Sequence, residues 1–133
     1  MTFKELVRSA LTGEMEDISA CGDDAGLFAS VPGAPGMGEF FGRLAEEKRE
    51  RLKELGRIFR EGTGFRQRKS APSRSVEAAL RSRAARAGEA ASVYAALARS
   101  LNKPEYKESL KAMAERELEI LAAVREFQAG LRR

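Results

Sequence analysis

The chain has 133 residues, of which 43% are hydrophobic and 33% are charged, and it contains no histidine. This length predicts a single domain over residues 1–133, and without histidine the Ser/His/Asp and Cys/His nucleophilic systems are excluded. The formal net charge of +4 is too small to indicate a nucleic-acid-binding protein by itself.

Membrane insertion and disulfide bonding are both disfavoured by the sequence. No apolar run approaches the roughly 20 residues that span a bilayer. The single cysteine, Cys21, cannot form an internal disulfide. It falls on an apolar stripe, so we expect it to be a small core residue. We therefore expect a cytoplasmic protein that does not enter a membrane.

Apolar residues recur at helical spacing along the chain, which predicts an all-α fold. The first helix is expected over residues 3–28, because Thr2 and Glu5 form a capping-box pattern in front of an apolar stripe. Four residues weaken the end of this helix, so it should fray or stop between residues 21 and 30. They are Gly22, Asp23, Asp24 and Gly26.

Three further helices are expected over residues 38–60, 76–101 and 104–130. Ser75 can cap the third helix, and an early proline starts the fourth. Residues 62–74 form a basic connection that is longer than most loops between helices. The order of short, long and short loops predicts an up-down-down-up four-helix bundle with one long crossover loop.

Basic residues gather in the segment 65–86, and the basic patch at its start consists of Arg66, Arg68, Lys69 and Arg74. Such a patch could bind nucleic acid or an acidic partner through a salt-dependent attraction. No glycine-rich phosphate loop, zinc spacing or interleaved aromatic surface accompanies it. An ordinary solvated face is the favoured interpretation, and nucleic-acid binding is the lesser one.

Four charged residues interrupt the apolar stripes of the predicted helices, namely Glu14, Lys48, Arg83 and Glu117. An unpaired charge is costly to bury, so these side chains should meet one another or reach water. We predict that Lys48, with Arg51 or Arg83, neutralises the two glutamates in a core ion-pair cluster. The alternative is that the long side chains extend out of a loosely packed bundle into water.

Four motifs in order give the chain a family resemblance. They are Gly13-Glu14-Met15-Glu16, Leu44-Ala45-Glu46-Glu47 after Glu39-Phe40-Phe41, the run Val93-Tyr94-Ala95-Ala96-Leu97-Ala98, and Met113-Ala114-Glu115-Arg116-Glu117. The chain resembles a rubrerythrin-type member of the ferritin-like superfamily over nearly its whole length. That resemblance implies a ferritin-like four-helix bundle. It also implies an ancestor that bound two irons and handled oxygen or peroxide.

The di-iron site of such a family takes one glutamate from each of two helices and a Glu-x-x-His pair from each of the other two. Carried over to this chain, the resemblance keeps two of these six ligands, Glu14 and Glu117. The other four positions are occupied by Lys48, Arg51, Ala87 and Ile120. The resemblance therefore implies a degenerate di-iron site.

The expected function is that of a non-catalytic binding, scaffolding or regulatory protein without a cofactor. The first alternative is a metal-dependent oxidoreductase, a peroxidase or oxidase, with an incomplete site. Such a site would hold iron or another divalent metal with carboxylates drawn from Glu14, Glu47, Glu50 and Glu117. The second alternative is binding of nucleic acid or an acidic partner through residues 65–86.

The expected assembly is a homodimer, with an unknown protein as a further partner. Amphipathic bundles of this size often have a second apolar face to cover. The candidate surfaces for this contact are Val93, Tyr94 and Leu97, or the region of Phe65. For Tyr94, a place in the core is the favoured alternative.

Overall fold

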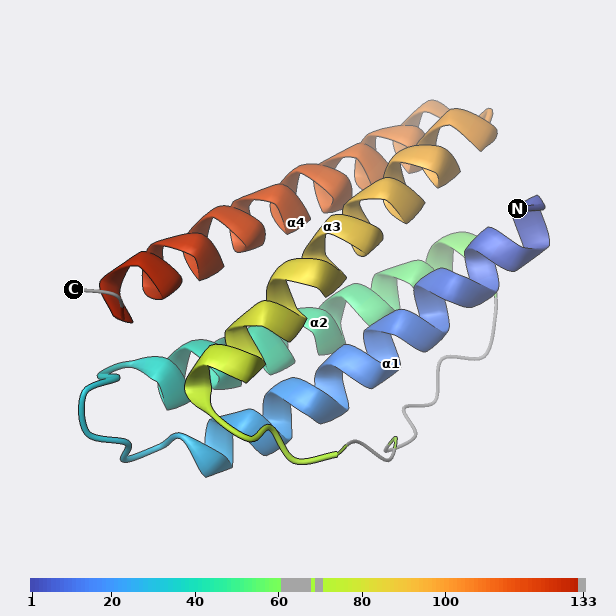
Figure 1. Ribbon diagram of the computed structural model, residues 1–133. Helices are drawn as coiled ribbons and strands as arrows, with labels where there is room; N and C mark the ends of the chain where they lie inside the picture. Colours follow the sequence, from blue (N-terminus) through green and yellow to red (C-terminus); the bar gives the residue numbers. More distant parts are fainter. Residues whose placement is uncertain (61–67, 69–70, 132–133) are drawn as a thin grey trace. The chain divides into compact units, whose positions relative to one another are not determined.

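The computed structural model describes residues 1–60, 68 and 71–131 and is all-helical over them (Figure 1). These residues form four α-helices and no strand: α1 (Phe3–Leu27), α2 (Met37–Phe59), α3 (Val76–Ser100) and α4 (Pro104–Leu131). The predicted all-α class is confirmed, and these are the elements of a four-helix bundle. The ferritin-like order of the helices stays a prediction. None of the described helices carries an apolar stretch of the length that crossing a bilayer requires.

The chain divides into two compact units, and each is described by itself. The α1–α2 unit comprises residues 11–79, and the α3–α4 unit comprises residues 1–10 together with residues 80–133. The division falls inside α1 and α3, so both helices contribute to both units. The expectation of a single domain stays a prediction.

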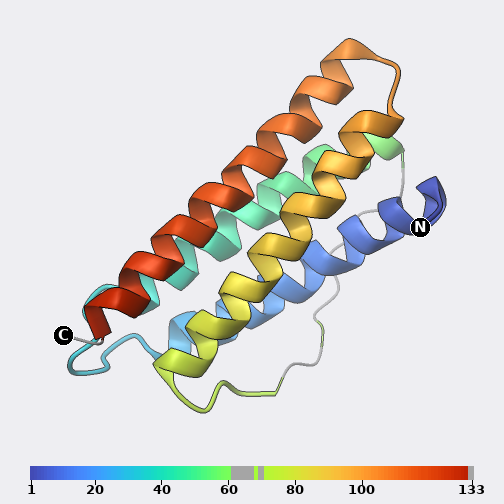
Figure 2. The same ribbon diagram turned by 45° about the horizontal axis from the view of Figure 1, so that its top comes forward.

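In the α1–α2 unit, residues 11–27 of α1 and the whole of α2 lie side by side and antiparallel (Figures 1 and 2). Their contact is apolar near the connecting loop, where the ring of Phe41 lies 6.0 Å from that of Phe28 and 5.6 Å from that of Phe40, measured between centroids. Farther along, Met15, Ile18 and Leu52 form a second buried cluster. Burial of these side chains removes apolar surface from water and holds the helix pair together.

The loop between α1 and α2 depends on glycine at two kinds of position. Gly33 and Gly36 have φ angles of +82°, a backbone conformation that other residues rarely adopt. Gly38, in the first turn of α2, lies against the end of the preceding turn, because a Cβ built on it would come within 2.7 Å of the Ala29 Cα. Only a residue without a side chain lets α2 start this close to the loop.

In the α3–α4 unit, α3 and α4 form a second antiparallel pair (Figures 1 and 2). Its most deeply buried side chains include Leu80, Leu110 and Val124. Lys107 of α4 donates hydrogen bonds from Nζ to the carbonyl oxygens of Ala98, at 2.7 Å, and Leu101, at 3.0 Å. A cation at this position satisfies carbonyls that the end of α3 leaves without helical partners and complements the helix dipole.

The starts of α1 and α3 follow the capping patterns in the sequence. The backbone N–H of Thr2 donates to Glu5 Oε2, at 2.9 Å, and the N–H of Glu5 donates to Thr2 Oγ1, at 3.1 Å, which completes the predicted capping box. Ser75 Oγ accepts a hydrogen bond from the N–H of Ala78 at 3.0 Å, which confirms its predicted role as the cap of α3.

The candidate dimer surface on α3 is wrong for two of its three residues. Tyr94 is 1% exposed and Leu97 is fully buried, because both lie on the core face of α3. Val93 is partly exposed, and Phe65 lies outside the described residues. A core place for Tyr94, which the sequence favoured, is confirmed.

We expect Gly38→Ala to lower the free energy of unfolding by about 1–3 kcal/mol, because the new methyl group meets backbone atoms that can move only with the loop. Denaturant-induced unfolding followed by circular dichroism measures the change.

Gly42→Ala is the matched control in the same helix. A Cβ at Gly42 would meet the Ala25 Cβ at 3.8 Å, an ordinary contact, so alanine there should be neutral or stabilise by up to about 1 kcal/mol through its helix propensity. Equal effects of the two substitutions would contradict the close approach at Gly38.

Candidate functional site

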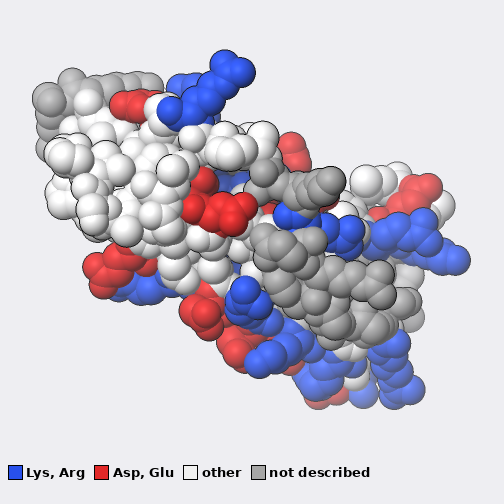
Figure 3. Space-filling view, turned by 90° about the horizontal axis from the view of Figure 1, so that it is seen from below, with Lys and Arg blue, Asp and Glu red and all other residues white. Residues whose placement is uncertain are grey.

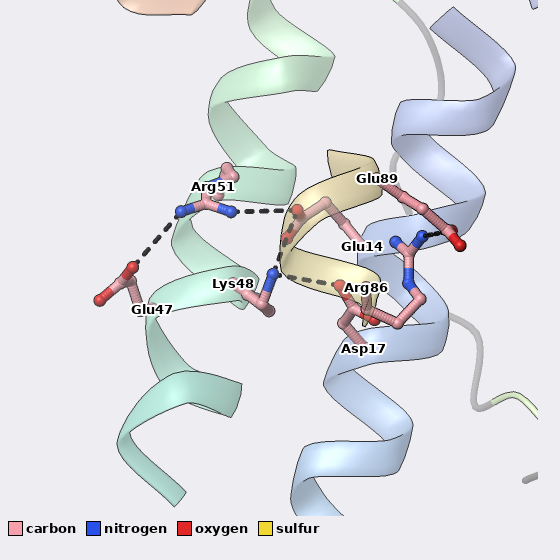
Figure 4. Close-up of polar contacts among 7 residues, drawn as sticks. All are labelled: Glu14, Asp17, Glu47, Lys48, Arg51, Arg86 and Glu89. Atoms are coloured by element: carbon pink, nitrogen blue, oxygen red, sulfur yellow. Dashed lines mark hydrogen bonds and ion pairs between the residues drawn. The ribbon is translucent and has the colours of Figure 1, made fainter. Parts of the chain in front are cut away.

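A group of charged side chains is buried between α1 and α2 of the α1–α2 unit (Figure 4). Glu14 and Asp17 lie one helical turn apart on α1, and Lys48 and Arg51 lie one turn apart on α2. The exposed fraction is 1% for each acid, 2% for Lys48 and 7% for Arg51. These four residues, together with Glu47, are called the ion-pair cluster below.

Lys48 is in contact with both buried acids of the cluster. Its Nζ donates a hydrogen bond to Asp17 Oδ2 at 3.1 Å and lies 3.5 Å from Glu14 Oε1. Arg51 approaches the same Glu14 oxygen, since its Nη1 donates to Oε1 at 3.2 Å. Glu14 Oε1 is therefore held between an ammonium and a guanidinium group.

Arg51 also reaches outward along its own helix. Its Nη2 donates to Glu47 Oε2 at 3.4 Å, and the Glu47 side chain is 35% exposed. Glu47 and Arg51 are one helical turn apart on α2, and Glu47 lies between the four buried residues and the solvent. The cluster thus continues from the core to the surface through Arg51.

The four buried members of the cluster carry two formal positive and two formal negative charges. Transfer of each charge from water into the core is costly, and attraction between close partners offsets this cost only when the geometry is good and no charge is left over. Here each acid has a cation within 3.5 Å, so the charges balance. Such an arrangement tolerates the loss of both members of a pair better than the loss of one.

The exposed ion pairs of α2 differ from this cluster in their surroundings. They join Arg43 to Glu39, Lys53 to Glu50 and Arg57 to Glu54. The hydrogen bond from Arg57 lowers the pKa of Glu54, although partial burial opposes the shift. This pair therefore stabilises the fold at neutral pH and loses its effect as the pH falls through the lowered pKa, by no more than about 0.5 kcal/mol because water screens it.

Within the α1–α2 unit, the structure brings together three of the residues that the sequence singled out. Lys48 and Arg51 meet Glu14 as described, whereas Glu50 lies on the exposed face of α2 with Lys53. The remaining four lie in the α3–α4 unit and are buried there: Arg83, Ala87, Glu117 and Ile120.

Asp17 is the member of the cluster that the sequence analysis missed. It follows Glu14 by three residues, so the two acids share one face of α1. Glu14 is the acid that interrupts the apolar stripe of the first helix, so the sequence pattern pointed to Glu14 and not to Asp17. The sequence offers one signal for Asp17, its spacing of one helical turn from Glu14, and exposed acids often share that spacing.

Of the basic patch, the structure describes Arg68 and Arg74. Arg68 is tied to α1, since its backbone N–H donates to Ser19 Oγ at 2.9 Å and its Nη2 donates to Met15 Sδ at 3.3 Å. Arg74 is exposed, and Arg66 and Lys69 lie outside the described residues. On the face drawn in Figure 3, Lys and Arg side chains have Asp and Glu side chains as neighbours.

Two kinds of group near the cluster could take part in chemistry, the buried carboxylates as metal ligands and the thiol of Cys21. The buried carboxylates of the cluster are those of Glu14 and Asp17, and the Lys48 ammonium already contacts both. Cys21, the one thiol of the chain, is fully buried. A buried thiol of this kind packs as a small apolar side chain.

Comparisons of the chain with models of known protein families, with curated proteins and with solved structures find no match. The rubrerythrin resemblance stays a prediction, and the function has to be inferred from the geometry of the site.

We expect Lys48→Met to lower the free energy of unfolding by roughly 3–5 kcal/mol, because it removes the cation that contacts the buried carboxylates of Asp17 and Glu14. The double variant Asp17→Asn with Lys48→Met should regain about half of this loss or more, since it removes both charges and leaves the Arg51 contact to Glu14 in place. Urea unfolding of the three proteins at pH 7 measures both values.

Lys53→Met is the control, because it removes an exposed lysine from the same helix. Its effect should stay within about 0.5 kcal/mol. If Lys48→Met were as mild as Lys53→Met, the buried lysine would have to reach water, and the ion-pair interpretation would fail.

Proposed function

We propose that this chain is a rubrerythrin-like helical protein without catalytic metal chemistry, which acts by binding another protein. The observation that carries the proposal is the contact of the Lys48 ammonium with both Asp17 and Glu14 in the core of the α1–α2 unit. A fixed protein cation there supplies the positive charge that the two buried acids need.

Electrostatics supports this proposal over the oxidoreductase alternative. A divalent ion that approached Glu14 and Asp17 would be repelled by Lys48 and Arg51, and it would have to displace Lys48 from its two acidic partners. Iron in helical bundles also takes histidine as a ligand, and the chain has none.

The positions of the two cations add to this support. Lys48 and Arg51 stand where the family resemblance implies the glutamate and histidine of the second helix. Both contact Glu14, the residue to which the resemblance assigns the ligand of the first helix. In the proposal, ion pairs between side chains have replaced metal bonds at these positions and now hold α1 to α2.

Metal analysis tests the proposal. Protein incubated with Fe²⁺ or Mn²⁺ and then desalted should contain far less than one metal ion per chain by plasma mass spectrometry. Its thermal unfolding midpoint should be unchanged by either metal or by a chelator, because a bound metal would raise that midpoint. A stoichiometric metal together with a raised midpoint would contradict the proposal and favour the metal-binding alternative.

A further inference from the structure

Helix α4 has a row of exposed residues on the side away from its core face. The core face consists of the buried residues Leu110, Met113, Glu117, Ile120 and Val124. The exposed row, called the α4 strip below, consists of Lys111, Glu115, Leu118, Ala122, Arg125 and Ala129. Steps of four and three residues alternate along it, which is the spacing by which two helices pack as a coiled coil.

Leu118 lies near the centre of the α4 strip and is 55% exposed. A single exposed leucine is common on protein surfaces and indicates nothing by itself. Here the next position of the strip is Ala122, whose small side chain leaves space for a leucine from a facing helix. Leu118 and Ala122 therefore form a matched large and small pair at the middle of the strip.

Two charges of opposite sign lie at equal distances from this centre. Glu115 is five residues before position 120 and Arg125 is five residues after it, and both side chains are exposed. No described residue forms an ion pair with either of them. By contrast, Arg116 and Glu119, which flank the strip, pair with each other along α4 at 3.2 Å. Glu115 and Arg125 can accept partners from another chain without loss of an ion pair in the described part of this one.

Reversal of the α4 strip makes it complementary to itself. When a second α4 lies antiparallel to the first and is centred on position 120, Leu118 of each copy faces Ala122 of the other. In the same arrangement, Glu115 of each copy faces Arg125 of the other. Because the two copies are related by a two-fold axis, every one of these pairs occurs twice.

We propose that the chain forms a homodimer through the α4 strip, with the two α4 helices antiparallel. The leucine and alanine contacts form its apolar centre, and the glutamate and arginine pairs lie on either side. The sequence analysis expected a homodimer but placed its surface on α3, where Tyr94 and Leu97 are buried. The dimer goes beyond the proposed function and does not depend on it, since it uses no residue of the ion-pair cluster.

Charge complementarity favours a second, antiparallel copy over other occupants. A parallel copy would place glutamate against glutamate and arginine against arginine, and facing like charges oppose association. A wholly basic or wholly acidic helix would attract one half of the strip and repel the other. The contact is only one helix wide in each chain, so we expect a weak dimer that dissociates on dilution.

Sedimentation equilibrium of the full chain from micromolar to millimolar concentration tests the dimer. The average mass should rise with concentration from that of one chain toward that of two. Leu118→Ala should raise the dissociation constant by about tenfold or more, because it removes apolar contact at two places in each dimer. Alanine suits an exposed helical position, so circular dichroism should show that this variant keeps its fold.

Charge reversals test the antiparallel arrangement. Glu115→Arg and Arg125→Glu should each raise the dissociation constant by about tenfold or more, because each places two pairs of like charges face to face. A mixture of these two variants should form a heterodimer. The chain with both changes should dimerise within about threefold of the wild-type affinity, since every facing pair is again oppositely charged.

Glu16→Arg is the control for net charge, because it makes the same substitution at an exposed acid of α1. It should change the dissociation constant by less than about threefold.

The proposal is overturned if the wild-type chain stays monomeric up to millimolar concentration, or if Leu118→Ala dimerises as the wild type does. It is also overturned if Glu16→Arg weakens the dimer as much as Glu115→Arg, or if the doubly reversed chain dimerises as weakly as the single variants. None of these outcomes involves metal content, so failure here is distinguishable from failure of the proposed function.

Discussion

The contact of the Lys48 ammonium with Asp17 and Glu14 is the interaction on which the α1–α2 unit depends most. Apolar attraction is non-directional, whereas a buried charge requires an opposite charge within hydrogen-bonding distance. A displacement of α2 along α1 by one turn would leave one acid and one cation of the cluster without a partner on the facing helix. The ion-pair cluster therefore fixes the register of the two helices, the role for which buried polar groups are best attested.

Periodicity and capping residues were enough to place all four helices within one residue of their observed ends. The pairing of Glu14 with Lys48 could be anticipated because a charge inside an apolar stripe must find a partner. Asp17 could not be selected in the same way, since many acids sit one turn from another acid on exposed helix faces. The order of the helices in space was also beyond reach, because helical amphipathicity states which face is buried but not against which neighbour.

The charges of the ion-pair cluster and those at the end of α1 differ in their effect on the helix. In the cluster, every buried acid has a cation on the facing helix, so the charges are balanced within the chain. At the end of α1, two acids and two glycines oppose the helix that contains them. The first arrangement stabilises the contact between α1 and α2, and the second lowers the local helix preference of the last turns of α1.

The bridge from Lys107 to the end of α3 has a consequence for how the chain folds. Its hydrogen bonds join residues nine and six positions apart, whereas Lys48 and Asp17 are 31 positions apart. By the logarithmic dependence of loop-closure entropy on length, closing the longer loop costs about 1 kcal/mol more than closing the nine-residue one. The turn between α3 and α4 can therefore form from contacts close in sequence, before any long-range pairing. The ion-pair cluster can form only after α1 and α2 have come together. Its charges pair correctly only when these two helices are in their native register.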